Sequence, residues 1–383
     1  MITAVVIKTV FILLVAVAGL VPVITWIERK QSAVMQDRIG ANRADVAGIT
    51  ILGLFHPIAD VVKLFTKEDV VPHGANRALH LLAPMLAVVP AIIAFAVIPF
   101  GGVYHFGETT VDLVVANVDW GLLYIFAIGS IAAYGAVLGG WASFNNWAML
   151  GSLRASAQMI SYEVTMGLSV VGVFMVFQTL RLTDMAIAQD TTFRAFGFLE
   201  VLFGVSVPAW LEWARVPNWG IFLQPLGFVM FLTAIMAENK RPPFDIPEGE
   251  SEVVAGYHLE YSGMRFGLFY MSEFIEVVVI AGLVTTLFLG GWAIPWVSQQ
   301  TFIGAVAPTF GEGFATGLCL VAHFATFMLK VIAMIWLQMA LRWTLPRFRY
   351  DQVMDLCWKI ILPLSLANIF VTGAVILWLQ GAA

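Results

Sequence analysis

The chain has 383 residues, of which 60% are hydrophobic and 12% are charged, with a formal net charge of −5 and a mean hydropathy of +0.88. This composition excludes a water-soluble globular protein, because no soluble core needs so large a share of apolar residues. The two cysteines, Cys319 and Cys357, cannot supply the ligands of a four-cysteine iron–sulfur cluster or zinc site. No haem-attachment, Walker or dinucleotide motif is present either, so we expect no metal and no redox cofactor bound by this chain.

Apolar runs of about twenty residues predict an all-α integral membrane protein, since the strands of a β-barrel would alternate in polarity over about ten residues. The first run is longer than a signal-peptide core and lacks a small-residue cleavage site, so we expect it to be retained. We treat the chain, residues 1–383, as a single transmembrane domain. Its eight predicted spans cover residues 5–26, 81–100, 121–141, 159–178, 219–236, 266–289, 317–340 and 360–379.

Within the first long loop, residues 57–68 alternate apolar and charged positions at helical spacing. The apolar positions include Ile58, Val61 and Phe65, and the other face carries Asp60 and Lys63. This pattern predicts a short amphipathic helix, which fits either the membrane surface or a docked partner. An ordinary connecting helix would show the same pattern, and the sequence leaves the two open.

A second irregular stretch covers residues 193–217, between the fourth and fifth predicted spans. It is apolar but is interrupted by Glu200, Pro208, Glu212 and Arg215. We therefore predict an interfacial insertion, formed as a hairpin or as a helix lying in the interface.

Lysine and arginine indicate the orientation of the spans. Of the 20 such residues, fifteen lie on the side of loops 27–80, 142–158, 237–265 and 341–359, and three lie on the opposite side. The remaining two, Lys8 and Lys330, lie within spans. Because an excess of these residues marks cytoplasmic loops, we expect both termini on the periplasmic side.

Several ionisable residues fall within predicted spans, where each costs roughly 2.5–3.5 kcal/mol on insertion scales. Glu163 lies in the fourth span, and Glu273 and Glu276 lie at i,i+3 spacing in the sixth. His323 and Lys330 lie in the seventh span, on one helix face. Structural salt bridges or residues near the lipid headgroups would explain some of these positions. His323 more often satisfies a local hydrogen bond than relays protons, so we leave it out of the predicted site.

The most acidic segment, residues 237–263, separates the fifth and sixth spans. We expect Asp245 to cap a helix with Pro247 in its first turn, so that Glu248 and Glu252 share one face. Acids in a first helical turn also suit the helix dipole, so a solvated helix start remains an alternative. Together with the intramembrane carboxylates, this segment predicts a polar passage that opens to the cytoplasm and passes protons or cations. A polar pocket for an amphipathic ligand fits the same pattern.

Four motifs carry a resemblance to a known family over nearly the whole chain. They are Glu28 to Arg43 together with His56 to Glu68; Gly140 to Glu163; Glu238 to Gly263; and Leu345 to Gln352. The chain resembles the NuoH-type membrane subunit of proton-pumping NADH:quinone oxidoreductase, respiratory complex I. This resemblance implies a subunit that forms the quinone chamber where the membrane arm meets the peripheral arm.

The resemblance also implies site residues. Those matching the quinone chamber are Arg29, Arg38, Asp60, Lys63, Asp245 and Glu248. Those matching a carboxylate channel for protons are Glu163, Glu238, Glu248, Glu250, Glu252, Glu260 and Glu273, and Lys330 matches a lysine of the seventh span. Glu276 has no counterpart in the family, so we expect it to be structural.

Cofactors and partners follow from the same resemblance. Quinone, for example ubiquinone, is the implied substrate, and NADH, FMN and iron–sulfur clusters are expected in partner subunits. The implied partners are the quinone-module subunits of the peripheral arm, small neighbouring membrane subunits and membrane lipids, with no nucleic acid. The implied location is the inner (plasma) membrane of a bacterial cell.

Three other functions remain possible on the sequence. The first is the homologous membrane subunit of a hydrogenase-type complex that binds no quinone, although the long first loop argues against it. The second is a free-standing ion-coupled transporter, which should show internal repeats that this sequence lacks. The third is a structural anchor for a peripheral arm, which leaves the intramembrane acids unexplained.

Overall fold

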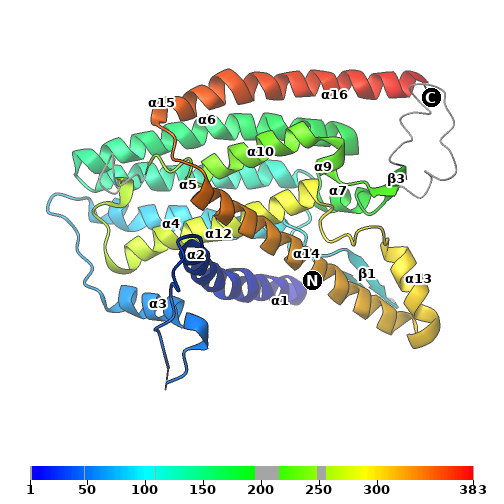
Figure 1. Ribbon diagram of the computed structural model, residues 1–383, viewed down its shortest axis with the longest axis horizontal. Coiled ribbons are helices and arrows are strands. Elements are labelled where there is room, and N and C mark those ends of the chain that lie inside the picture. Colours follow the sequence, from blue (N-terminus) through cyan, green and yellow to red (C-terminus); the bar gives the residue numbers. More distant parts are fainter. Residues whose placement is uncertain (1, 47, 108, 195–214, 248–255, 383) are drawn as a thin grey trace.

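A computed structural model describes residues 2–46, 48–107, 109–194, 215–247 and 256–382 as a bundle of long helices (Figure 1). Within these residues, seven helices are long and apolar enough to cross a membrane. Each overlaps one predicted span, so the prediction of a multi-pass helical membrane protein is confirmed. The seven helices are Val5–Met35, Arg77–Val97, Gly121–Ala142, Asn146–Phe177, Gly263–Phe288, Glu312–Thr344 and Tyr350–Gln380.

The N-terminal helix runs without a break from α1 (Ile2–Ile12) through a π-helical segment (Leu13–Leu20) into α2 (Val21–Met35). The loop that follows contains a single 3₁₀ turn and then α3 (His56–Thr66), which is the predicted amphipathic helix. The apolar stripe of α3 faces outward, with Phe65 67% exposed. The stripe therefore has no cover from the described part of this chain.

Helix α4 (Arg77–Ala94) begins where the Asn76 side chain accepts hydrogen bonds from the backbone amides of Ala78 and Leu79, an N-cap. It packs along α5 (Gly121–Ala142), and Gly135 lies so close to α4 that a Cβ there would stand 3.0 Å from the carbonyl oxygen of Ala83. Small residues allow this approach, and in lipid such close packing replaces the hydrophobic effect as the force between helices. The segment of chain that connects α4 to α5 contains a β-hairpin, β1 (Val103–Phe106) paired with β2 (Thr109–Asp112), which the sequence did not predict.

Helix α6 (Asn146–Phe177) begins within the predicted loop 142–158, because Asn145 caps it by accepting a hydrogen bond from Trp147 N. It is followed by α7 (Leu182–Ala188) and by β3 (Thr192–Arg194), which pairs antiparallel with β4 (Arg215–Pro217). These strands bracket the predicted interfacial insertion, whose residues 195–214 lie outside the described residues.

The predicted span 219–236 is divided into two helices, α9 (Gly220–Leu223) and α10 (Pro225–Glu238). The break falls at Gln224, since a residue before proline disfavours the helical conformation and Pro225 supplies no backbone N–H. Its side chain instead bonds to α16 (Leu362–Ala382), because Gln224 donates to Thr372 Oγ1 at 2.8 Å and accepts from Asn368 Nδ2 at 3.0 Å. Helix α10 has 14 residues, about 21 Å of rise, which is less than the roughly 30 Å hydrocarbon layer. The predicted span 219–236 therefore consists of two helices, and neither is long enough by itself to cross the hydrocarbon layer.

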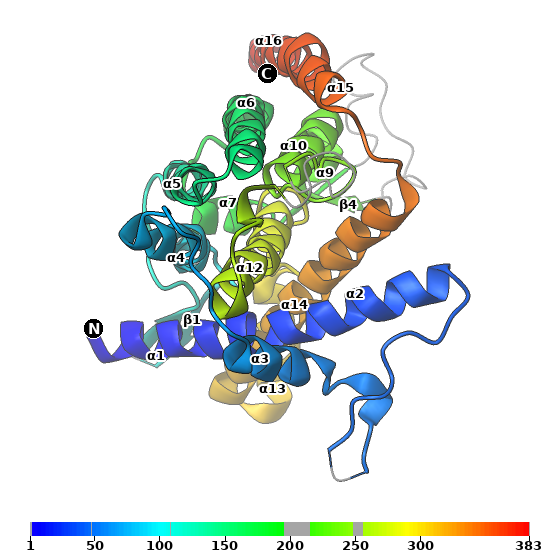
Figure 2. The same ribbon diagram turned by 90° about the vertical axis from the view of Figure 1, so that its left-hand side faces the viewer.

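Helix α12 (Gly263–Phe288) lies at the centre of the bundle, as Figure 2 shows. It packs against α2, α3, α4, α7, α10 and α14 (Glu312–Thr344). Its residues from Val277 to Phe288 are all buried, so this helix forms the core. The chain continues through α13 (Gln299–Phe310), which the sequence did not predict, and α14 (Glu312–Thr344). It ends with α15 (Tyr350–Asp355), a π-helical segment (Leu356–Ile361) and α16 (Leu362–Ala382) along one side (Figure 1).

Candidate functional site

The loop that follows α10 is fixed to α6 by one buried side chain. Gln158 Nε2 donates to the carbonyl oxygens of Ala237 at 2.7 Å and of Phe244 at 2.8 Å. The backbone N–H of Phe348 donates to the carbonyl of Pro243 at 3.1 Å, which adds the segment after α14 to the same contact. These bonds hold residues 238–245 between the ends of several helices.

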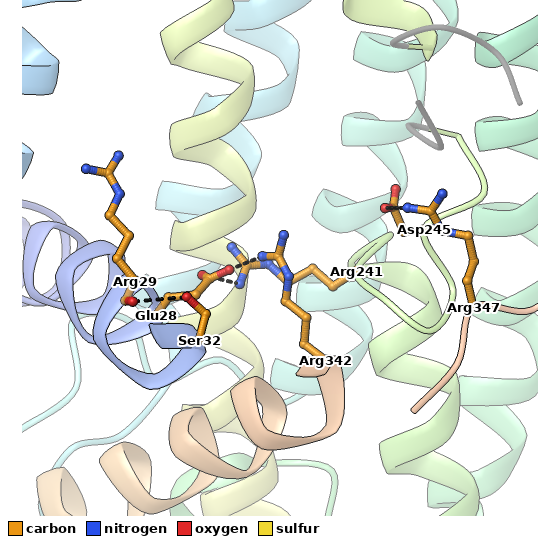
Figure 3. A network of polar contacts seen from close by, with 7 residues as sticks. All are labelled: Glu28, Arg29, Ser32, Arg241, Asp245, Arg342 and Arg347. Atoms are coloured by element: carbon orange, nitrogen blue, oxygen red, sulfur yellow. Dashed lines mark hydrogen bonds and ion pairs between the residues drawn. The ribbon is translucent and has the colours of Figure 1, made fainter. Parts of the chain in front are cut away.

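A buried ion-pair network lies beside this loop (Figure 3). The carboxylate of Glu28, on α2, accepts from Arg241 Nη1 at 3.1 Å and from Arg342 Nη1 near the end of α14. The Glu28 and Arg241 side chains are each only 8% exposed. The Arg241 guanidinium also packs over the ring of Phe274 on α12, 4.3 Å from its centroid. The Glu28 carboxylate thus joins three segments of the fold, and Arg241 adds α12 as a fourth. The sequence-based site did not include Glu28.

Beside this network, two predicted chamber residues form an ion pair. Arg29 Nη2 lies 2.5 Å from Asp60 Oδ2, which connects α2 to α3. Arg38 Nε donates to Gln36 Oε1 at 2.7 Å on the exposed loop, and Lys63 is exposed in the last turn of α3. Arg29 and Asp60 are therefore brought together, whereas Arg38 and Lys63 are left facing outward.

Asp245 forms the second ion pair in Figure 3, with Arg347 Nη2 2.7 Å from its Oδ2. Burial raises the pKa of Asp245 to about 6 from an ordinary value of 3.8, although the Arg347 guanidinium acts in the opposite direction. The predicted chamber residue Asp245 therefore changes its charge near pH 6. The helix predicted to start after it falls on residues 248–255, which lie outside the described residues, as do Glu248, Glu250 and Glu252.

Several buried polar atoms near these ion pairs have no hydrogen-bond partner. They are the side-chain amide atoms of Gln31, the Nε and Nη2 atoms of Arg241, and the Oδ1 atom of Asp245. Leaving such a group unpaired costs about 1–3 kcal/mol. The arrangement therefore has free donors and acceptors for water or for a polar ligand group.

A cavity of about 80 Å³ lies deeper in the bundle, between α4, α5, α6, α10 and α12. Two predicted channel residues line it, Glu163 from α6 and Glu238 from α10. The Ser130 hydroxyl of α5 donates a hydrogen bond to Glu163 Oε1. Glu276 of α12 lines the cavity too, although it was expected to be structural.

The remaining predicted channel residues lie in three different places. Glu273 is 7% exposed on α12, one turn before Glu276. Glu260 Oε1 accepts a hydrogen bond from Asn145 Nδ2 at 2.6 Å, at the start of α6. Lys330 donates to the carbonyls of Leu289, Gly291 and Ala293 at 2.7, 3.0 and 2.7 Å, beyond the C-terminal end of α12. The three protons of Lys330 are therefore all engaged by backbone oxygens, at the end of α12 opposite to Glu273.

The buried residue His323, which we left out of the predicted site, makes a local bond: its Nδ1 lies 2.8 Å from the Tyr104 hydroxyl. Burial raises the pKa of Tyr104, so this phenol stays protonated at neutral pH. Among the described residues, no group of three or more histidine, cysteine, aspartate or glutamate side chains is placed to hold a metal ion.

The sequence reasoning missed Glu28, Arg241 and Arg342. Glu28 and Arg241 stand inside the motifs that carried the resemblance, close to the selected residues Arg29 and Glu238. Their separation in sequence gave no sign of contact, because Glu28 and Arg241 are 213 positions apart.

Comparison with known proteins identifies the family. The profile of the family described as NADH dehydrogenase matches residues 7–373. The chain is 45% identical over 350 residues to an H-type NADH-quinone oxidoreductase subunit of Geobacter metallireducens, covering 91% of this chain and 90% of that protein. It is 42% identical to the corresponding H-type protein of Bdellovibrio bacteriovorus (93% and 92% covered) and 43% identical to that of Thermomicrobium roseum (97% and 96% covered). The chain therefore belongs to the NADH dehydrogenase family, within the H-type membrane subunits of the NADH-quinone oxidoreductase enzyme complex.

Proposed function

We propose that this subunit forms the membrane side of the quinone-binding chamber and links quinone reduction to proton translocation. The observation that carries the proposal is the short segment Glu238 to Asp245. Its first residue lines the intramembrane cavity, and Arg241 and Asp245 lie in the two ion-pair clusters of Figure 3. The ion pairs of Arg241 and Asp245 and the cavity carboxyl group of Glu238 therefore belong to one segment of eight residues. A new charge beside these ion pairs, such as that of a reduced quinone, would act on Glu238 through this segment.

In this proposal, the quinone head group binds near Arg29, Arg38, Asp60, Lys63, Asp245 and Glu248. The unpaired N–H groups of Arg241 and the free oxygen of Asp245 are available to such a head group. Arginine donors stabilise the negative charge that develops on a quinone when it is reduced. The electrons come from an iron–sulfur cluster of a partner subunit, with NADH and FMN further upstream in the complex.

The proposed proton path uses carboxyl groups. It comprises Glu163, Glu238, Glu248, Glu250, Glu252, Glu260 and Glu273. Carboxyl groups that lie close together raise one another's proton affinity, so a change of charge at the quinone redistributes protons among them. The proposal has least support for Lys330 as a proton carrier, because three backbone carbonyls accept hydrogen bonds from its ammonium group.

The proposed topology has eight crossings, with α9 and α10 together making the fifth and both termini on the periplasmic side of a bacterial inner membrane. The lysine and arginine bias supports this orientation. It places the ion pairs of Glu28 and Asp245 at the cytoplasmic face, where the peripheral-arm subunits would cover them as partners. The whole chain then acts as one transmembrane domain beside smaller membrane subunits.

The test uses membranes that carry the assembled complex with Glu163→Gln. We expect NADH:quinone reductase activity and proton pumping to fall together, while NADH oxidation by an artificial acceptor that bypasses the quinone stays unchanged. The matched control is Asp355→Asn, the same carboxyl-to-amide change at an exposed position paired only with Lys359 in the described structure. Unchanged pumping in Glu163→Gln would remove the proton path from the proposal.

A further inference from the structure

The carboxyl group of Glu276 lines the intramembrane cavity, although the sequence predicted a structural role for this residue. It reaches the same cavity as Glu163 and Glu238, so three carboxyl groups from α6, α10 and α12 line one space of about 80 Å³. A carboxyl group among apolar helix positions costs several kcal/mol unless something compensates it. The structural role considered from the sequence was a salt bridge, and no ion pair of Glu276 is found within the described residues.

A second feature of the cavity indicates what fills it. Asn239 is 1% exposed, lines the cavity, and neither its Nδ2 nor its Oδ1 atom has a hydrogen-bond partner. Oε2 of Glu238, on the same wall, is also without one. These three atoms would each cost about 1–3 kcal/mol if the space were dry. Because a water molecule in the liquid takes up about 30 Å³ and bonds to two to four polar partners, the cavity has the size and the groups for at least two.

Glu276 also connects the cavity to the ion pair of Asp245 through a second carboxyl group, Glu273. Glu276 lies one helical turn after Glu273 on α12, and the two carboxyl groups interact electrostatically. Glu273 in turn interacts with Asp245, which is paired with Arg347. Pairwise electrostatic interactions thus connect Asp245 to Glu273, Glu273 to Glu276, and Glu276 to Glu238.

We propose that Glu276 passes protons between Glu273 and a small water cluster held by Asn239 and Glu238 in this cavity. The inference rests on the proposed function and adds two residues that the family resemblance does not supply. Each step moves one proton from a carboxyl oxygen to water or to another carboxyl oxygen, so no oxidant or reductant is consumed. The other charged groups that interact electrostatically with Glu276 are Lys240 and Arg241.

The experiment compares Glu276→Gln, Glu276→Asp and Asn239→Leu in the assembled complex in membranes. Glu276→Gln keeps the size and removes the titratable proton. Quinone reductase activity coupled to pumping should therefore fall by at least about tenfold, since a proton-transfer group typically contributes about 10²–10⁴-fold. Glu276→Asp keeps the carboxyl group and should retain most of the activity. Asn239→Leu keeps the branching of the side chain, replaces both polar atoms that could bond to water by methyl groups, and should also lower pumping. Bypass activity with the artificial acceptor should be unchanged in all three.

Retention of more than half of the coupled activity in Glu276→Gln overturns the inference. If Glu163→Gln is inactive in the same preparation, only the role of Glu276 fails; if both variants pump normally, the proposed proton path fails as well. Should Glu276→Gln prevent assembly, infrared difference spectra of Glu276→Asp decide. A carboxyl band that shifts on quinone reduction relative to the unmodified complex supports the inference, and an unchanged spectrum refutes it.

Discussion

The ion-pair network around Glu28 makes a quantitative prediction. In Glu28→Gln, the amide cannot neutralise Arg241, whose side chain is only 8% exposed and whose Nε and Nη2 atoms already lack partners. Removing one member of a buried pair leaves an uncompensated charge and costs about 3–5 kcal/mol. Arg342 is 25% exposed and can turn toward water, so we assign most of the loss to Arg241. A loss of this size changes the unfolding equilibrium of the chain by about 10²–10⁴-fold.

The assay is reversible unfolding of the full-length chain in mixed detergent micelles, followed by helical circular dichroism. The matched control is Asp60→Asn, because the Asp60–Arg29 pair is 40% and 42% exposed and such a pair contributes only about 0–1 kcal/mol. The double variant Glu28→Gln with Arg241→Met removes the stranded charge and should recover part of the loss. If Glu28→Gln is no more destabilising than Asp60→Asn, the network does not behave as a buried ion pair and the reasoning is refuted.

Three other outcomes follow from the structure. Burial raises the pKa of Asp245 to about 6, so between about pH 3.8 and pH 6 the folded chain keeps a proton that the unfolded chain loses. The stability of the folded chain should therefore fall as pH rises between these values. Unfolding measured at a series of pH values should show this slope, and Asp245→Asn should lack it. Lys330→Met leaves three carbonyl groups without a donor and should lower the free energy of unfolding by about 1 kcal/mol for each in the same assay. If Lys330 acted in proton transfer alone, this substitution would leave the free energy of unfolding unchanged. Phe65→Ser changes a side chain that is 67% exposed, so the unfolding free energy of the isolated chain should change by less than about 0.5 kcal/mol. If a partner subunit covers α3, less of the assembled complex should be recovered on native gels.

The helices that the sequence predicted well are the ones whose signal is local. Long apolar runs mark spans because hydrocarbon removes every alternative to internal backbone hydrogen bonds. The amphipathic helix α3 was likewise predicted from the spacing of its apolar residues. The divided span at Gln224 and Pro225 was missed, although Pro225 carried the signal, because the side-chain partners that stabilise the break lie on α16, 144 and 148 positions away.

Some residues of the candidate site could be predicted from the sequence, and others could not. The cost of burying charge was enough to select Glu163 and Glu273, and motif resemblance added Arg29, Asp60 and Asp245. Composition, apolar runs and motifs were thus sufficient to identify a helical membrane subunit of the NADH dehydrogenase family with an acidic segment beside its spans. The contacts between charged residues became visible in the folded chain alone: Glu28 pairs with Arg241, Glu276 lines the cavity of Glu163 and Glu238, and Lys330 donates to backbone carbonyls. Electrostatic interactions depend on distance and burial in space, and both are set by helix packing between segments far apart in the chain.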